Sequence, residues 1–407
     1  MLLRRLLLSG AIVAYALVFG EVFLRLFVPQ PLVPRFVTGA ADGVRANMAN
    51  VAFLQSTPEV DVTVRYNDAG MRDDRPAPPR TKPPGECRIA LVGDSYFVGF
   101  ESSFANSFGK RLEDQLRTGG RNARVLNFAV SGFGTAEMLV AIRSRVTAYQ
   151  PDLIVMSWHA TDPVDNVRSN LFRLDDGRLT STGAAFLPGV AASDRLMRLP
   201  GYRWLIENSH AYSAVRERIA VQVKALLAAV RGRSLGGDEE SAEVAEVRPV
   251  SVDYRRSPPR PGSIDLDRAL LNASRDAAAR AGARFLLFEV PTSGSRTRLM
   301  PVLLPQLGLL GDIHTASPLA DFVAIAAPSV QLYLEQGHRH WTPLGNRVAA
   351  RAAARAIAAQ GLLANCGRFP DAEIRFEQLA LLPKSLIALR GRPRAALIAE
   401  TFGPLPN

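Results

Sequence analysis

Residues 87–95 read CRIALVGDS, and this stretch decides the fold. The first six residues are apolar except for Arg88, which is typical of a strand buried on both faces, and the run breaks at Gly93. Apolar spacing then predicts a helix over residues 107–117. A buried strand that passes through a glycine turn toward a helix is the repeating unit of a parallel α/β sheet.

The same unit recurs along the chain. Further strands are predicted over 124–128, 153–158 and 284–290, helices over 135–148, 264–281 and 343–360, and an additional apolar stretch over 322–330. Strands that alternate with helices, each strand nearly continuous in apolar residues, predict a three-layer α/β/α fold with a central, mainly parallel sheet. We expect its ligand site at the carboxyl ends of the strands.

Composition narrows the class of protein. The 407 residues are 47% hydrophobic and 21% charged, which fits a globular protein and excludes disorder throughout. The formal net charge is +11, but the arginines are scattered and no nucleic-acid-reading motif accompanies them, so we expect no nucleic-acid partner. The two cysteines, Cys87 and Cys366, are too few for a disulfide scaffold or a cysteine-rich metal site, and they allow one disulfide bond or two free thiols.

The N-terminal segment indicates the compartment. Leu6–Val28 reaches the roughly 20 residues of a membrane-spanning helix only by including Glu21 and Arg25, which lie four apart on one helix face. No pair of small residues suited to cleavage follows the apolar run, which favours an uncleaved anchor over a cleaved signal peptide. Because Arg4 and Arg5 precede the run, we expect the rest of the chain on the extracytoplasmic, periplasmic side.

We expect four parts in the chain. They are a cytoplasmic N-terminus and membrane anchor (1–28), a tether with a short strand region (29–85), an α/β domain (86–364) with an insertion around 184–262, and a tail (365–407) without an assigned role. Within these parts, the prolines of residues 29–60 indicate an irregular tether, and alternation predicts a strand over 62–66. Residues 202–231 predict a long amphipathic helix.

Polar residues follow three of the predicted strands. They are Asp94 and Ser95, then Ser131 and Gly132, then Thr161 and Asp162. A serine at a strand-to-helix turn suits an attacking nucleophile and needs a base, and three of the five histidines, His159, His338 and His340, lie where this edge is expected. We interpret His159 as packed or hydrogen-bonded rather than catalytic. A glycine at the second turn lets a backbone N–H approach a developing oxyanion.

Three blocks resemble those of the SGNH, or GDSL-type, hydrolase superfamily. Residues 93–99 (GDSYFVG) are similar to the nucleophile block, 127–134 (NFAVSGFG) to the block whose glycine donates to the oxyanion hole, and 340–346 (HWTPLGN) to the histidine block. Residues 65–73 resemble a segment of membrane-anchored members. The resemblance implies a flavodoxin-like SGNH fold, Ser95 as nucleophile, His340 as general base, and an oxyanion hole formed by Ser95, Gly132 and Thr161.

Two positions depart from the family. Its third block offers an Asn side chain to the oxyanion hole, whereas this chain has Thr161, a shorter group that donates one hydrogen bond. The family also places an Asp two or three residues before the histidine, where this chain has His338 and Gly337. His340 is then oriented by a backbone carbonyl, by Glu335, or by a residue from elsewhere in the chain.

Alternative assignments accompany these candidates. One pairs Glu335 with His338 as acid and base, but the Trp-Thr-Pro-x-Gly sequence that follows residue 340 favours His340. Taken alone, Ser95 also fits a helix N-cap, and the joint occurrence of three blocks favours its catalytic interpretation. Asp94 and Asp162 are candidate supporting residues.

The sequence therefore predicts a membrane-anchored, extracytoplasmic serine esterase or O-acyltransferase. The resemblance implies acyl, and first of all acetyl, groups of a cell-surface glycan as substrate. Hydrolysis and transfer share the serine chemistry and differ in whether water or a sugar hydroxyl receives the acyl group. Two rival classes are a non-catalytic binding or scaffold protein of the same fold, motivated by the two departures, and a lipid-active esterase with residues 183–200 as a lid.

We expect no cofactor and no metal. The chain has neither a phosphate-binding glycine loop with a lysine nor a dinucleotide fingerprint. His338 and His340 have no third ligand close in sequence and make a poor metal site.

Overall fold

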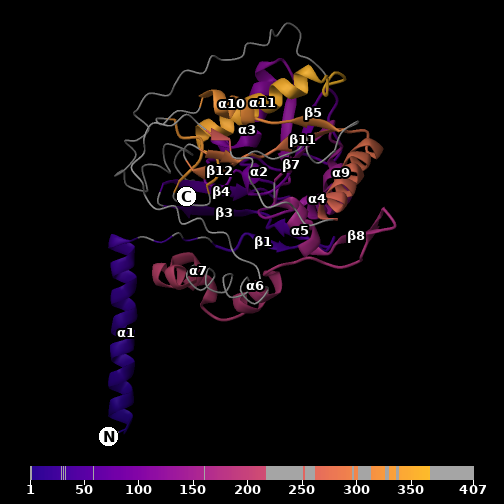
Figure 1. Cartoon of the computed structure of the whole chain (residues 1–407). Helices are drawn as coiled ribbons and strands as arrows, with labels where there is room; N and C mark the ends of the chain where they lie inside the picture. The colour runs from indigo at the N-terminus through magenta and orange to yellow at the C-terminus, as the bar shows by residue number, and fades with distance from the viewer. Residues whose placement is uncertain are drawn as a thin grey trace. The chain divides into compact units, whose positions relative to one another are not determined.

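Five parallel strands form the central sheet in the computed structural model (Figure 1). They are β5 (Cys87–Val92), β6 (Ala123–Asn127), β7 (Leu153–Trp158), β11 (Arg284–Glu289) and β14 (His314–Ala316). Their order in the sheet is β6-β5-β7-β11-β14, so the chain leaves β5 in one direction, returns, and continues in the other. This order confirms the predicted α/β fold and places a topological switch point between β5 and β7.

The structure describes residues 2–216, 251–252, 262–300, 313–325, 330–335 and 339–366, apart from positions 29, 31, 33, 58, 160, 296 and 297. Several predictions fall outside these residues. They concern the helix beyond residue 216, most of the insertion over 236–262, His338, and the tail from residue 367.

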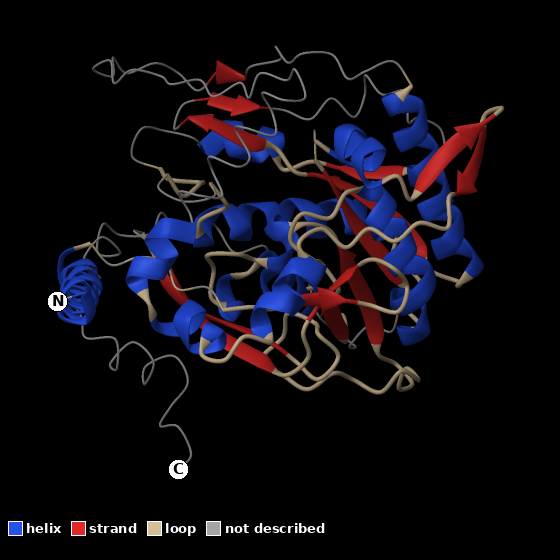
Figure 2. Ribbon diagram, turned by 90° about the horizontal axis from the view of Figure 1, so that it is seen from below, coloured by secondary structure: helices blue, strands red, loops and turns tan. Residues whose placement is uncertain are grey.

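Helices cover both faces of the sheet, as Figure 2 shows. One layer consists of α4 (Thr135–Ala141), α5 (Asp162–Ser169) and α9 (Ser263–Arg280), the other of α3 (Phe108–Thr118), α10 (Leu319–Ile325) and α11 (Pro343–Ala359). Because side chains alternate along a strand, Ala90 and Leu287 enter the core shared with α4 and α9. On the opposite face, the ring of Phe288 lies 5.2 Å from that of Phe108 in α3.

Several predicted helices are shorter or interrupted. The helix predicted over 135–148 continues beyond α4 as a π-helical turn (Ile142–Val146) and a 3-10 turn (Thr147–Tyr149). The segment 202–231 was predicted to contain a long helix, and in its described part α7 (Tyr202–Asn208) ends at Ser209, which has an extended backbone. The Ser209 hydroxyl accepts a hydrogen bond from the Tyr212 N–H at 3.0 Å and so caps a second helical stretch.

Residues 37–56 are not irregular, which corrects the expectation of a tether over 29–60, whereas the strand predicted over 62–66 is confirmed. Residues 37–66 form two antiparallel hairpins, β1 (Val37–Gly39) with β2 (Arg45–Asn47) and β3 (Val51–Ser56) with β4 (Asp61–Tyr66). Phe53 and Tyr66 are buried and stack on Phe36, which also contacts Phe100 beyond the nucleophile block. The prolines at positions 29, 31 and 34 precede the first hairpin and leave its strands uninterrupted.

The remaining elements are small or peripheral. They are α1 (Leu2–Phe27), α2 (Ser95–Val98), a 3-10 turn (Phe104–Asn106), β8 (Phe172–Asp175), β9 (Arg178–Ser181), α6 (Val190–Met197), β10 (Ser251–Val252), β12 (Thr292–Ser295) and β13 (Arg298–Met300). β8 and β9 form a hairpin, and β10, β13 and β12 form a three-stranded sheet.

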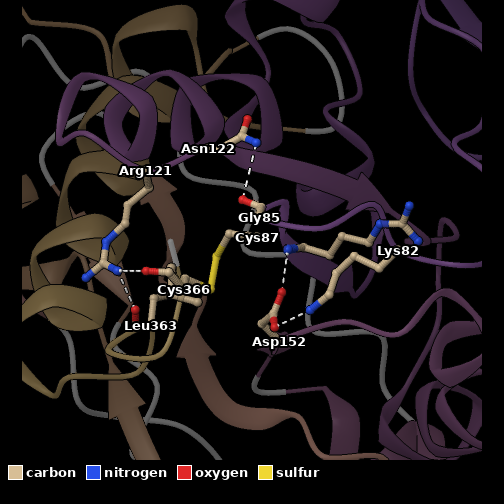
Figure 3. The surroundings of a disulfide bond; sticks show 9 residues. Lys82, Gly85, Cys87, Arg121, Asn122, Asp152, Leu363 and Cys366 are labelled. Atoms are coloured by element: carbon tan, nitrogen blue, oxygen red, sulfur yellow. Dashed lines mark hydrogen bonds and ion pairs between the residues drawn. A yellow bond between two sulfur atoms is a disulfide. The ribbon is translucent and has the colours of Figure 1, made fainter. Parts of the chain in front are cut away.

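Cys87 and Cys366 form a disulfide bond across 279 residues of sequence (Figure 3). It joins the first residue of β5 to the segment after α11, where Arg121 donates to the carbonyls of Leu363 and Cys366 at 2.6 Å each. Of the two alternatives that the sequence left open, the structure shows the bonded one. Disulfides persist in oxidising compartments, so this bond indicates an extracytoplasmic domain.

The apolar N-terminal stretch is helical. Within α1, residues Leu8–Phe27 have a mean hydropathy of 1.8 over the most apolar window, and that window is not buried against the protein. Its length fits a membrane span, and a signal sequence has the same properties.

Candidate active site

Three side chains form a hydrogen-bonded row at the carboxyl end of β5. Nε2 of His340 lies 2.8 Å from Oγ of Ser95, and Nδ1 of the same ring lies 2.8 Å from Oε2 of Glu101. His340 is 5% exposed and the Glu101 side chain is fully buried. A nucleophile, a base bonded to it and a carboxylate that orients the base are the parts of a serine-hydrolase triad. We call these three residues the acid–base row.

The turn after β5 presents Ser95. Asp94, not Ser95, is the N-cap of α2, and its carboxylate accepts a hydrogen bond from the Tyr96 N–H at 3.0 Å. Burial raises the pKa of Asp94, against the opposing charges of His159 and His340. Gly93 is required because a Cβ there would lie 2.4 Å from Oγ of Ser157. The Ser95 hydroxyl is therefore left to bond with His340.

Glu101 is a candidate site residue that the sequence patterns did not indicate. It lies six residues after Ser95 with φ +60°, a left-handed conformation uncommon for a residue other than glycine. Its backbone N–H donates to the side-chain oxygen of Gln55 in β3 at 3.0 Å. One signal was available: Glu101 is the single charged residue between Asp94 and Lys110. A charge inside an apolar block that follows a nucleophile is a candidate partner for the base.

Backbone hydrogen bonds fix the histidine block against a neighbouring segment. The Leu334 N–H donates to the carbonyl of His340 at 2.8 Å, and the Thr342 N–H donates to the carbonyl of Leu332 at 2.9 Å. Thr342 is the N-cap of α11, and a Cβ at Gly345 would lie 2.3 Å from the Leu332 carbonyl oxygen. Helix capping therefore explains the threonine of this block, and close backbone packing explains its glycine. Together these contacts hold the imidazole of His340 at the edge of the sheet.

The ring of His340 bonds through Nδ1 to Glu101, which favours a residue from elsewhere in the chain over Glu335 as its orienting group. His338 lies outside the described residues. The bond between His340 and Ser95 favours His340 over His338 as the base.

Gly132 stands in the loop after β6, next to the nucleophile turn. The Val130 N–H donates to the carbonyl of Gly93 at 3.0 Å, which joins the two loops. Gly132 has φ +75°, and its carbonyl accepts a hydrogen bond from the Arg45 guanidinium at 2.8 Å. Arg45 also pairs with Glu137 of α4 at 3.1 Å. A residue of the first hairpin therefore braces the loop that was predicted to supply an oxyanion donor.

Thr161 differs from Gly132 in its surroundings. It is exposed, and its hydroxyl lies 3.0 Å from Nδ1 of His159. Asp162 is buried beneath it and accepts a hydrogen bond from the His159 N–H at 3.0 Å, while burial and the neighbouring Asp267 raise the Asp162 pKa well above its usual range. His159 is thus hydrogen-bonded, as predicted. We call Gly132 and Thr161 the oxyanion edge.

The buried carboxylate of Asp267 in α9 is hydrogen-bonded to the elements next to the oxyanion edge. Asp267 accepts hydrogen bonds from Thr135 Oγ1 (2.8 Å), Trp158 Nε1 (2.6 Å) and Asn166 Nδ2 (2.7 Å). Burial raises the pKa of Asp267 to about 6, and these three hydrogen bonds oppose the rise. The network connects α9 with α4, β7 and α5 behind the edge.

Within the described residues, one group of three side chains is close enough to share a metal ion. It consists of Cys87, Asp152 and Cys366. The two sulfurs are bonded to each other, so they do not offer the thiolates that metals bind.

Comparisons with known proteins give matches among solved structures. No family model and no curated protein matches the chain. The crystal structure of TesA is 12% identical and covers 68% of this chain and 99% of its own, with a TM-score of 0.35. A putative lipolytic protein of the G-D-S-L family from Desulfitobacterium hafniense DCB-2 is 9% identical and covers 66% of this chain and 98% of its own, with a TM-score of 0.33. The psychrotrophic esterase EstA from Pseudoalteromonas sp. is 10% identical and covers 67% of this chain and 97% of its own, with a TM-score of 0.35.

Proposed function

We propose that the protein is an SGNH-type serine esterase or O-acyltransferase that is anchored in a membrane and acts outside the cytoplasm. The observation that carries the proposal is the row from Ser95 through His340 to Glu101, with 2.8 Å at both links. Among the proposed rivals, a scaffold protein without activity would have no need to keep a buried carboxylate on the imidazole.

The row performs acyl transfer in two steps. The Ser95 hydroxyl attacks the ester carbonyl while Nε2 of His340 takes its proton, and the same proton then passes to the departing alcohol. A water molecule, or a sugar hydroxyl in a transferase, next gives its proton to His340 and attacks the acyl group on Ser95. His340 then returns this proton to the Ser95 oxygen as the acyl–oxygen bond breaks, which restores the free serine. Glu101 holds the imidazole in orientation and stabilises its charged form. The backbone N–H groups of Ser95 and Gly132 donate hydrogen bonds to the carbonyl oxygen and so stabilise the negative charge that develops on it.

The proposed substrate is an O-acyl group, first of all acetyl, on a cell-surface glycan. The support comes from the motifs, which resemble membrane-anchored members of the superfamily, and from the disulfide bond, which indicates a domain outside the cytoplasm. The apolar helix α1 supports the anchor.

Activity on a short activated ester tests the enzyme class. The full-length protein in detergent should release nitrophenol from p-nitrophenyl acetate, and a serine-directed phosphonate should label Ser95 alone. Ser95→Ala is the matched control. Equal rates for the wild type and this variant, together with no labelling, would favour the scaffold protein.

An O-acetylated polysaccharide tests the substrate class. Acetate release in water indicates hydrolysis, and acetyl transfer to added oligosaccharide indicates a transferase. Activity on long-chain lipid esters alone would support the lipid-active esterase instead.

A further inference from the structure

The polar pair of α1 contacts the domain directly. Glu21 and Arg25 form an ion pair at 3.1 Å, and the Arg25 guanidinium also donates to the carbonyl of Asn208 at the end of α7 at 2.7 Å. The Glu21 carboxylate accepts hydrogen bonds from three groups: Ser209 Oγ (2.8 Å), the His210 N–H (3.0 Å) and the Ala211 N–H (2.9 Å). This carboxylate therefore caps the helical stretch that follows Ser209.

These contacts set the level of α7 relative to the apolar helix. Leu8–Phe27 is 20 residues long, which at 1.5 Å per residue is about 30 Å, the thickness of the hydrocarbon region. Glu21 lies six residues before the end of this stretch, or about 9 Å along the axis. The end of α7 is therefore held about 9 Å inside the outer end of the apolar stretch, within the roughly 5–10 Å to which an interfacial helix buries its apolar face.

α6, α7 and the turn between them expose apolar side chains next to arginines (both helices are labelled in Figure 1). Leu196, Leu199 and Trp204 are 40%, 55% and 61% exposed. The neighbouring Arg195, Arg198 and Arg203 are exposed as well. Leucine and tryptophan beside arginine are typical of a helix that lies in a membrane interface, where the aromatic ring contacts the acyl boundary and the cations contact phosphate groups. We call these six residues the interfacial platform.

We propose that the interfacial platform lies in the extracytoplasmic leaflet of the membrane that α1 crosses, with the arginines bound to anionic phospholipid headgroups. Two observations favour a bilayer over a second copy of the chain as the occupant. The platform is continuous with α1 through Glu21 and Arg25, and its apolar residues alternate with cations. The proposal rests on the membrane anchor of the proposed function. If the platform binds the membrane, the α/β domain is fixed close to the membrane surface and is not connected to it by a flexible tether alone.

Tryptophan quenching tests the platform in the full-length protein. Of the three tryptophans, Trp158 and Trp341 are buried (3% and 1% exposed), so Trp204 reports on the surface. In nanodiscs of phosphatidylcholine and phosphatidylglycerol, brominated lipids should quench the Trp204 contribution by roughly half or more, because the ring lies at the acyl boundary. The matched variant Trp204→Phe should lose this quenchable component. Replacing Arg195 and Arg198 by glutamine should weaken the quenching in anionic discs.

A second reporter separates the platform from the anchor. Tyr15→Trp in the Trp204→Phe background places the probe inside the apolar helix. Quenching at position 15 without quenching of Trp204 would leave the anchor in place and overturn the platform. Absence of quenching at both positions would overturn both proposals. Trp204 emission that shifts with protein concentration, and not with brominated lipid, would point to a second copy as the occupant and also overturn the platform.

Discussion

The acid–base row and the oxyanion edge are built in different ways. In the row, Ser95, His340 and Glu101 are joined through buried side-chain hydrogen bonds. At the edge, Gly132 offers a backbone group braced by Arg45, and Thr161 is exposed and bonded to His159. The difference follows from the chemistry, because proton transfer needs three side chains in fixed geometry whereas an oxyanion can be stabilised by backbone N–H groups. Under the proposed function, side-chain identity is therefore constrained in the row and freer at position 161.

Removal of the nucleophile or the base should have the largest effect. Ser95→Ala and His340→Ala should each lower kcat/KM for a short ester by about 10⁴-fold or more, and the double variant should lose little more, because the two residues act as a unit. Steady-state kinetics measure this, with thermal unfolding as the check on folding. Losses that add in the double variant would show that the two residues do not act together.

Removal of the orienting carboxylate should have the next largest effect. Glu101→Gln should lower kcat by roughly 10³-fold, because the amide no longer stabilises the imidazolium. Glu335→Gln is the matched control and should retain nearly full activity. Partial recovery in Glu101→Asp would identify the charge, and not the packing, as the cause. The reverse ranking of the Glu101 and Glu335 variants would move the orienting role to Glu335.

Behind the edge, Asp267 should make stability depend on pH. Its pKa is about 6 in the folded protein and about 3.9 in an unfolded chain, so the folded state binds the proton more tightly. The contribution of Asp267 to stability is then greatest at low pH and falls between about pH 4 and pH 6, by up to about 3 kcal/mol. Chemical denaturation of the wild type and Asp267→Asn at several pH values measures the difference. A wild-type curve as flat in this window as that of the variant would contradict the prediction.

Removal of the Arg45 side chain, which contacts the Gly132 carbonyl, should have a moderate effect on activity. Arg45→Met removes the hydrogen bond to the Gly132 carbonyl and the ion pair with Glu137. We expect kcat to fall on the order of tenfold, less than removal of an oxyanion donor itself, because the loop shifts while the N–H remains. Arg173→Met, which breaks an exposed ion pair with Asp175 in β8, is the control. Unchanged kcat in Arg45→Met would show that the hairpin does not position the loop.

Thr161→Ala should have the smallest effect. Its hydroxyl bonds to His159, so we expect activity within roughly threefold of the wild type. Thr161→Asn restores the side chain that the SGNH blocks usually have, and a higher kcat in this variant would mean that the edge accepts an additional donor. A loss in Thr161→Ala as large as that expected for Arg45→Met would instead place the threonine hydroxyl in the oxyanion hole.

The local pattern of the sequence was enough for β5, β6, β7 and β11 of the central sheet, but not for β14, and it singled out Ser95 and His340. Strands β5 and β7 have the predicted bounds, because continuous apolar runs mark strands buried on both faces. Ser95 and His340 lie in blocks whose glycines and threonine have local steric or capping roles. Such roles leave recognisable short motifs, and they place these residues without knowledge of the rest of the chain.

The residues that complete and support the candidate site come together only through the packing of the chain. Glu101 meets His340 across 239 residues, and Gln55 and Arg45 reach the nucleophile turn and the Gly132 loop from hairpins that the sequence indicated to be a tether. None of these three residues belongs to a periodic pattern or a short motif. Each of the three contacts a residue that is distant in sequence. Such a contact depends on how the whole chain packs, and the local sequence around the residue does not determine it.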